Sequence, residues 1–150
     1  RQAIPGCALR TTMLVGFPGE TEADFELLLD FVREVRFTRL GAFAFSPEEG
    51  SIAARLPNPV PLEATRERLN RLLELQEGIQ AEANEALFGK RADVLVEGIS
   101  AEGLLRGRTR HQAPEVDGEG FLDETEATAG EIIECEFIST DGVDLIARGI

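Results

Sequence analysis

The stretch TTMLVGFPGETEADFELLLDFV, residues 11–32, decides the fold of the first half of the chain. An apolar, β-favouring run stops at the glycine-flanked GFPG segment of residues 16–19, and an acidic, amphipathic segment follows at once. This order is typical of a strand, a tight turn and a helix. We therefore predict a strand over residues 9–15 and a helix that begins after Thr21 and continues to about Val35.

The start of this helix carries its own signals. Thr21 is predicted as the N-cap, and Asp24 follows three residues later in a near-capping-box arrangement. A second strand is predicted over residues 39–45, with Phe43 and Phe45 on one face. Because a helix separates the two strands, we expect a parallel βαβ unit with a right-handed crossover. The other face of the second strand would carry the small residues Ala42, Ala44 and Ser46.

Further along, three prolines mark a loop over residues 47–61, and helical spacing of leucines predicts a long helix over about 62–88. From Lys90 the pattern changes to short β runs separated by glycine turns, which predicts a small antiparallel barrel. We place the boundary between the two parts near residues 86–90. The expected barrel strands are residues 92–96, 104–108, 120–122, 131–138 and 145–147.

The charge is unevenly distributed. Of the net charge of −13, residues 1–90 contribute −4 (10 Lys and Arg against 14 Asp and Glu), and residues 91–150 contribute −9 (5 against 14). Such a field repels phosphate backbones and favours a basic partner, although acidity can also serve only solubility. No apolar segment is long enough to span a membrane and no secretory signal is visible, so we expect a cytoplasmic protein. The chain starts at Arg1 rather than Met, and we expect it to be a fragment.

Three segments, taken together with the barrel pattern, resemble the closing third of the radical S-adenosylmethionine methylthiotransferases. They are the VGFPGET turn of residues 15–21, FSPEEG at 45–50 and RLNRLLELQ at 68–76. The resemblance implies that residues 1–86 are the C-terminal portion of a radical SAM core, a partial α/β (TIM-like) barrel. It implies that residues 87–150 are a TRAM domain, a small OB-like β-barrel.

The segment RTRHQAPEVDGEGFL, residues 108–122, resembles the branch that modifies an aspartate of the basic ribosomal protein S12. Gln112 stands where that branch usually has Asp. The transfer-RNA branch has an asparagine-rich segment here, which this chain lacks. The resemblance therefore implies transfer of a methylthio group to an aspartate β-carbon of a protein, with nucleic acid unlikely as the direct substrate. A transfer-RNA enzyme, or a non-enzymatic RNA-binding module using Arg106, Arg108 and Arg110, remains the alternative.

The same resemblance implies two kinds of cofactor, S-adenosylmethionine and two 4Fe–4S clusters that are each held by three cysteines. This chain has only Cys7 and Cys135, which show no ligand spacing, so the clusters would be bound outside it. We accordingly expect no catalytic or metal-binding residue within these 150 residues, and no activity of the fragment alone.

Parallel strands usually present ligands at their carboxyl ends, and this places the candidate cofactor site at the GFPG turn. Arg10 and Thr12 share a strand face with Gly16, and Arg10 could pair with the carboxylate of the cofactor or be a surface charge. The two glycines could equally serve only a tight turn. Ala42, Ala44 and Ser46 would leave room on the side of the barrel lumen. The candidate cofactor-binding residues are Arg10, Thr12, Val15, Gly16, Phe17, Phe45 and Ser46, and the candidate substrate-binding residues are Arg108, Arg110, Glu115 and Asp117.

Overall fold

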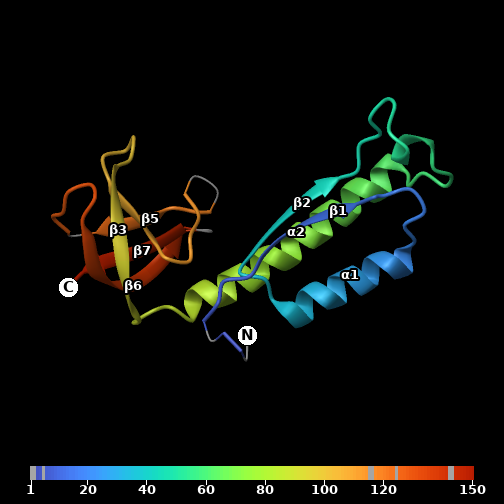
Figure 1. The fold of residues 1–150 in the computed structure, drawn as a ribbon. Helices are drawn as coiled ribbons and strands as arrows, with labels where there is room; N and C mark the ends of the chain where they lie inside the picture. The colour runs from blue at the N-terminus through green and yellow to red at the C-terminus, as the bar shows by residue number, and fades with distance from the viewer. Residues whose placement is uncertain (1–2, 5, 115–116, 124, 142–143) are drawn as a thin grey trace. The chain divides into compact units, whose positions relative to one another are not determined.

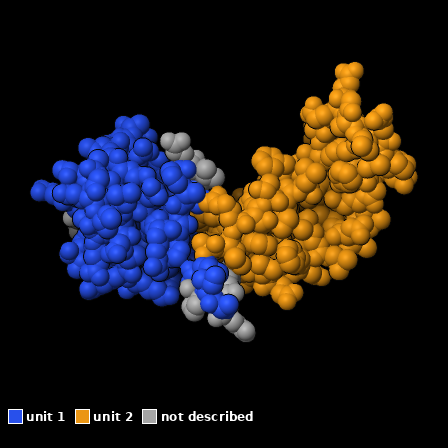
Figure 2. Space-filling view, viewed as in Figure 1, with its two compact units in different colours: residues 1–7, 80–150 blue, residues 8–79 orange. Residues whose placement is uncertain are grey.

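The computed structural model describes residues 3–4, 6–114, 117–123, 125–141 and 144–150. Within them the chain divides into two compact units, residues 8–79 and residues 80–150 with 1–7, coloured separately in Figure 2. The division falls inside a long helix, α2 (Leu62–Glu85). The predicted boundary at residues 86/87 stays a prediction.

The first unit is built on two parallel strands, β1 (Arg10–Val15) and β2 (Arg39–Ala44), joined through helix α1 (Glu22–Val35) (Figure 1). The βαβ unit predicted from the sequence is thus confirmed. A short 3-10 turn, η1 (Ala53–Arg55), lies in the loop that leads to α2. Both helices cover the same face of the strand pair. The buried core between them consists of Val15, Phe25, Leu29, Val32, Leu72 and Ile79.

The predicted start of α1 is also confirmed. Thr21 is the N-cap, and its hydroxyl accepts a hydrogen bond from the Asp24 N–H at 3.2 Å. The Asp24 carboxylate accepts in return from the Thr21 N–H at 2.9 Å, which completes a capping box. Two N–H groups that the helix itself leaves unpaired are satisfied in this way.

The second unit contains a closed five-stranded barrel in the order β3-β4-β5-β7-β6, which closes through the β3–β6 pair. The prediction of an all-antiparallel barrel was wrong in one pairing, because β5 and β7 run parallel. Strand β6 lies between these two strands in the sequence, and it pairs with the other edge of β7. The strands are β3 (Arg91–Ile99), β4 (Leu105–Thr109), β5 (Gly120–Asp123), β6 (Ile132–Asp141) and β7 (Asp144–Gly149).

Alternate residues of these strands fill the barrel, as the two-residue period of a strand requires. Two glycines face each other across β4 and β5, Gly107 and Gly120. A Cβ on Gly107 would lie 2.6 Å from the Leu95 carbonyl oxygen, so the backbones approach too closely for a side chain. The buried core consists of Val94, Val96, Leu122, Cys135, Phe137, Leu145 and Ala147.

No helix within the described part of the chain is long and apolar enough to cross a membrane.

Candidate functional site

The turn after β1 is organised around Gly16. Gly16 has a φ of +78°, and a Cβ at this position would lie 2.4 Å from both Cγ2 and Oγ1 of Thr65 on α2. The Gly16 N–H donates to both carboxylate oxygens of Glu20, at 3.0 and 3.1 Å. Glycine is therefore required here by its conformation and by the close approach of a helix.

Glu20 is in turn held by a buried arginine. The side chain of Arg68 on α2 is 9% exposed, and its Nη1 lies 2.7 Å from Glu20 Oε1. Its Nη2 lies 3.1 Å from Glu22 Oε2. Burial alone would lower the pKa of Arg68, but hydrogen bonds to Glu20 and then Glu22 raise it overall. The arginine therefore stays charged and fixes the turn to α2 over a separation of 48 residues.

Arg71 continues this ion-pair network one turn along α2. Its guanidinium contacts Glu22 at 2.9 Å and also binds Glu26, and it lies 4.9 Å from the centre of the Phe25 ring. Hydrogen bonds from Arg71 and then Arg68 lower the pKa of Glu22. Sequence reasoning missed both arginines. A signal was present, because Arg68 and Arg71 are spaced to occupy one helix face opposite the acidic start of α1.

The strand face away from the helices carries the exposed apolar groups of this unit. Thr12 is exposed, and Leu14 and Phe43 have exposed fractions of 48% and 63%. The parallel register pairs Leu14 with Phe43, so both side chains lie on the same face. At the carboxyl end of the strands, the rings of Phe17 and Phe45 meet edge to face with centroids 5.3 Å apart. This group brings together the predicted residues Thr12, Phe17 and Phe45 with two neighbours that were not predicted.

The prediction placed Ala42, Ala44 and Ser46 on the side of the barrel lumen, which in such a barrel is the strand face away from the helices, and it was wrong for Ala42 and Ala44. Ala42 packs against the core beneath the helices, and Ala44 shares its face by alternation. The physical reason is the register: because Leu14 lies opposite Phe43, the open face carries Phe43 rather than the alanines. The bulkier, aromatic side of β2 is therefore the one left uncovered.

The remaining candidate cofactor residues are placed as follows. Arg10 is exposed at the start of β1 on the same face as Thr12, and it makes a contact of its own. Val15 is fully buried, and its carbonyl accepts from the Phe45 N–H at 2.8 Å. Ser46 is exposed and follows the end of β2. Since backbone groups of Val15 and Gly16 are engaged within the chain, these two residues shape the turn.

In the barrel, the arginines of β4 are paired with acids. Arg106 Nη1 lies 2.8 Å from Glu119 Oε1, and Arg108 Nε lies 2.6 Å from Glu97 Oε1. Arg110 follows β4 and donates to His111 Nε2 at 3.2 Å. The pairings partly neutralise the arginine series that sequence reasoning considered for RNA binding.

The loop after β4 is held from inside by Gln112, which is 5% exposed. Its Oε1 accepts from the Thr109 N–H at 2.9 Å, and its Nε2 donates to the Gly118 carbonyl at 2.6 Å. The predicted substrate residue Asp117 accepts from the Ala113 N–H at 2.8 Å, so it too organises the loop. Glu115 lies outside the described residues.

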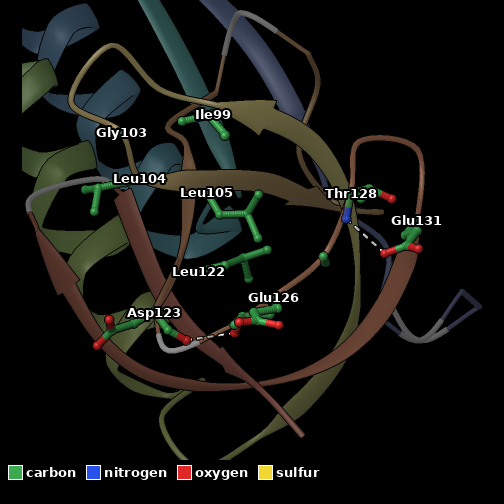
Figure 3. Close-up of a pocket in the computed structure, with 11 residues that line it drawn as sticks. Ile99, Gly103, Leu104, Leu105, Leu122, Asp123, Glu126, Thr128 and Glu131 are labelled. Atoms are coloured by element: carbon green, nitrogen blue, oxygen red, sulfur yellow. Dashed lines mark hydrogen bonds between the residues drawn. The ribbon is translucent and has the colours of Figure 1, made fainter.

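A pocket of about 740 Å³ opens at the other end of β4 and β5 from this loop (Figure 3). We call it the barrel pocket. Sequence reasoning did not find it, because its walls come from a turn, two strand ends and a loop that meet only in the folded barrel. It is lined by Ile99, Gly103, Leu104, Leu105, Leu122, Asp123, Thr125, Glu126, Ala127, Thr128 and Glu131.

The cysteines do not fit an iron–sulfur cluster. Both are free, and Cys135 is fully buried in the barrel core, where burial and then the nearby Glu134 raise the pKa of its thiol. Cluster ligands are thiolates, which such a site disfavours. Among the residues that the structure describes, no group of three or more His, Cys, Asp or Glu is placed to hold a metal ion.

Comparison with known proteins finds similar proteins that match both units of the chain. Residues 88–150 match the family model of the TRAM domain. The chain is 49% identical over 150 residues to a protein of Syntrophobacter fumaroxidans and 47% identical over 150 residues to one of Anaeromyxobacter sp. strain K. It is 47% identical over 147 residues to a protein of Thermus thermophilus. All three are named ribosomal protein uS12 methylthiotransferase RimO.

These matches cover 97–99% of this chain but only 32–34% of each relative, at the C-terminal part. The chain thus spans about a third of the length of the curated relatives it matches. The resemblance derived from the GFPGET turn, the FSPEEG segment and the barrel is confirmed.

Proposed function

We propose that this chain, which matches the C-terminal part of the RimO-type methylthiotransferases along nearly its whole length, serves as that part of such an enzyme. The whole protein would transfer a methylthio group to the β-carbon of an aspartate in ribosomal protein uS12. The single observation that carries the proposal is that the similarity extends over both units, and so is not confined to the TRAM domain.

In this proposal the first unit is the last part of a radical SAM core. Its open strand face offers a hydroxyl at Thr12, an aliphatic side chain at Leu14 and the aromatic rings of Phe17, Phe43 and Phe45. Apolar and aromatic groups with a few polar ones are the usual lining of a nucleoside site. These residues fit one wall of an S-adenosylmethionine site, with Arg10 and Ser46 at its margins and Val15 and Gly16 as its support.

The iron–sulfur clusters that supply the radical chemistry when bound would be held by cysteines in the remainder of the protein. Cys7 and Cys135 are too few for them, and Cys135 is buried in the barrel core. We therefore expect the chain alone to have no methylthiotransferase activity.

The second unit would bind the substrate protein. Residues 91–150 carry 5 Lys and Arg against 14 Asp and Glu, and Arg106 and Arg108 are paired with acids. A domain of this charge attracts a cationic partner and repels a phosphate backbone. In addition, β4 and its neighbours contain one aromatic residue, Phe121, for base stacking between residues 104 and 123. We therefore assign the substrate to protein rather than RNA, and place the enzyme in the cytoplasm with its ribosomal substrate.

The test incubates the full-length protein, carrying reconstituted clusters and supplied with S-adenosylmethionine, in two parallel reactions. One reaction contains uS12 and the other contains transfer RNA. Mass spectrometry should detect a methylthio group on a uS12 aspartate and leave the RNA unmodified. Modification of the RNA without the protein would assign the chain to the transfer-RNA branch.

A further inference from the structure

The barrel pocket combines an apolar floor with an acidic rim. Leu122 is 5% exposed and forms the floor with the half-buried Leu105 and Ala127. Ile99 and Leu104 stand at the mouth with exposed fractions of 68% and 51%. Large aliphatic side chains exposed beside a hollow are typical of a surface that is covered by a partner.

Backbone hydrogen bonds shape the pocket walls. The Gly130 N–H donates to the Val96 carbonyl at 2.8 Å, and the Val96 N–H donates to the Glu131 carbonyl at 2.8 Å. On the opposite side, the Ser100 N–H donates to the Leu104 carbonyl at 2.7 Å, closing the turn between β3 and β4. The two walls are thus fastened to the barrel, and the pocket is formed before any ligand arrives.

Three carboxylates surround this hollow, those of Asp123, Glu126 and Glu131 (Figure 3). None of the eleven lining residues is Lys, Arg or His. Glu131 also accepts from the Thr128 N–H at 2.9 Å, and Asp123 has a contact of its own, whereas Glu126 is an exposed side chain at the rim. The charge therefore complements a cation, and the floor complements an aliphatic group.

We propose that the barrel pocket docks a cationic polypeptide segment that inserts an aliphatic side chain between Leu104 and Leu122. The proposal rests on the proposed function in one respect: the segment would belong to the substrate protein. Peptide rather than nucleic acid is favoured because the lining offers acids and aliphatic groups, with neither a cation for phosphate nor an aromatic ring for a base.

The experiment measures binding of a fluorescent peptide of lysine, leucine and glycine to the full-length protein by anisotropy at about 0.15 M salt, where distant charges are screened. Glu126→Lys should weaken binding by about tenfold, because a rim charge now repels the ligand. The matched control is Asp93→Lys, the same charge change at an exposed site on β3, six residues before Ile99. Asp93 lies three residues from Val96, whose N–H bonds the carbonyl of the lining residue Glu131, so roughly 10 Å of strand separates it from the edge of the pocket. This exceeds the screening length of about 8 Å at 0.15 M salt, and the effect of Asp93→Lys should stay below about twofold.

A second variant tests the apolar half. Leu104→Ser should weaken peptide binding by roughly fivefold, since it removes apolar area at the mouth without a change in charge. Replacing the leucines of the peptide by glycine should produce a similar loss and should make the Leu104→Ser effect disappear.

Equal losses from Glu126→Lys and Asp93→Lys would overturn the proposal, and so would equal binding of a peptide with glutamate in place of lysine. Selective binding of a single-stranded RNA probe at the pocket would overturn it as well. The methylthio assay separates the two hypotheses. Transfer to uS12 with a KM unchanged by Glu126→Lys defeats the docking site alone, whereas selective peptide binding without any transfer to uS12 defeats the proposed function alone.

Discussion

Two independent features of the structure, the backbone conformation and the packing of a helix, each require glycine at position 16. Its φ of +78° lies in the left-handed region, and the side of the residue that would carry a Cβ is occupied by Thr65 at 2.4 Å. The sequence alone left open whether the glycine serves a ligand or a turn. The structure supplies a packing reason that is sufficient by itself, because helix α2 passes where a side chain would begin.

Replacing Gly16 should therefore destabilise the chain strongly. We expect Gly16→Ala to lower the free energy of unfolding by roughly 2–4 kcal/mol, from overpacking together with a left-handed backbone. The control is Gly19→Ala, at φ +92°, where an added Cβ would meet no atom within 4 Å and a loss of roughly 1 kcal/mol is expected. Denaturant titration measures both.

Adding Thr65→Ala to Gly16→Ala should recover part of the lost free energy of unfolding, because it removes side-chain atoms of Thr65 that the new Cβ would meet. Equal losses of stability for Gly16→Ala and Gly19→Ala would contradict the packing argument.

Gln112 is a second residue whose identity the structure explains. The amide bridges the loop by accepting from the Thr109 N–H and donating to the Gly118 carbonyl. The Asp that the resemblance implies at this position could accept but could not donate when ionised. Gln112 thus holds the loop with both a donor and an acceptor.

Gln112→Glu keeps the length of the side chain but removes the donor. At neutral pH we expect a loss of about 2 kcal/mol or more, because a buried carboxylate would face the Gly118 carbonyl. Burial should raise the pKa of the new carboxyl in the folded state, so the loss relative to wild type should shrink as the pH falls and the carboxyl regains a proton to donate. Thermal melting across pH measures this. The exposed neighbour variant His111→Ala should change little, and a pH-independent loss for Gln112→Glu would refute the donor role.

At the scale of elements, local signals predicted far more than long-range ones. The capping box at Thr21 and Asp24 and the amphipathic helix follow from spacing within a few residues, and the parallel pairing follows from the helix between the two strands; all are observed. The open face of β2 did not follow, because it depends on the register with β1. The bonds of Arg68 to Glu20 and Glu22 span 46 to 48 residues and require α2 to be placed first.

The capping box makes the stability of α1 depend on pH. Hydrogen bonds from Thr21, first from its side chain and then from its backbone, lower the pKa of Asp24 below its ordinary 3.8. A lowered folded-state pKa means that the contribution is fully present above 3.8 and is lost as the pH falls through the lowered value. Asp24→Asn keeps an acceptor but removes the charge. The melting temperature of wild type should exceed that of the variant at neutral pH, and the gap should close well below pH 3.8.

The same experiment needs a carboxylate outside the capping box as control. Asp93→Asn, at an exposed site on β3, should produce no comparable gap at neutral pH. The difference in melting temperature between wild type and Asp24→Asn could also persist unchanged into acid. That result would show that the charge of Asp24 is not the cause of the lower stability of the variant.

At the scale of the whole molecule, the sequence predicted two kinds of architecture, and the structure has both. The closed barrel was expected from five short β runs, although the parallel β5–β7 pair was not. Each unit has its own buried core, one under helices α1 and α2 and one inside the barrel. The barrel pocket could not be predicted, since residues 99–105, 122–123 and 125–131 converge only when the barrel closes.

These two units define what the chain would contribute to a larger enzyme. The first presents an open face of Thr12, Leu14 and Phe43 with the Phe17–Phe45 pair at its edge. The second offers an acidic domain with a preformed pocket. In the proposed function, the first unit would form a cofactor wall and the second would dock a cationic protein.

The most direct measurement is the intact mass of uS12 after reaction with the full-length protein. The account predicts that one hydrogen of an aspartate side chain is replaced by a methylthio group, and that a truncated protein lacking residues 88–150 fails to produce this product while still cleaving S-adenosylmethionine. A uS12 mass that never changes, with the methylthio group recovered on transfer RNA instead, would contradict it.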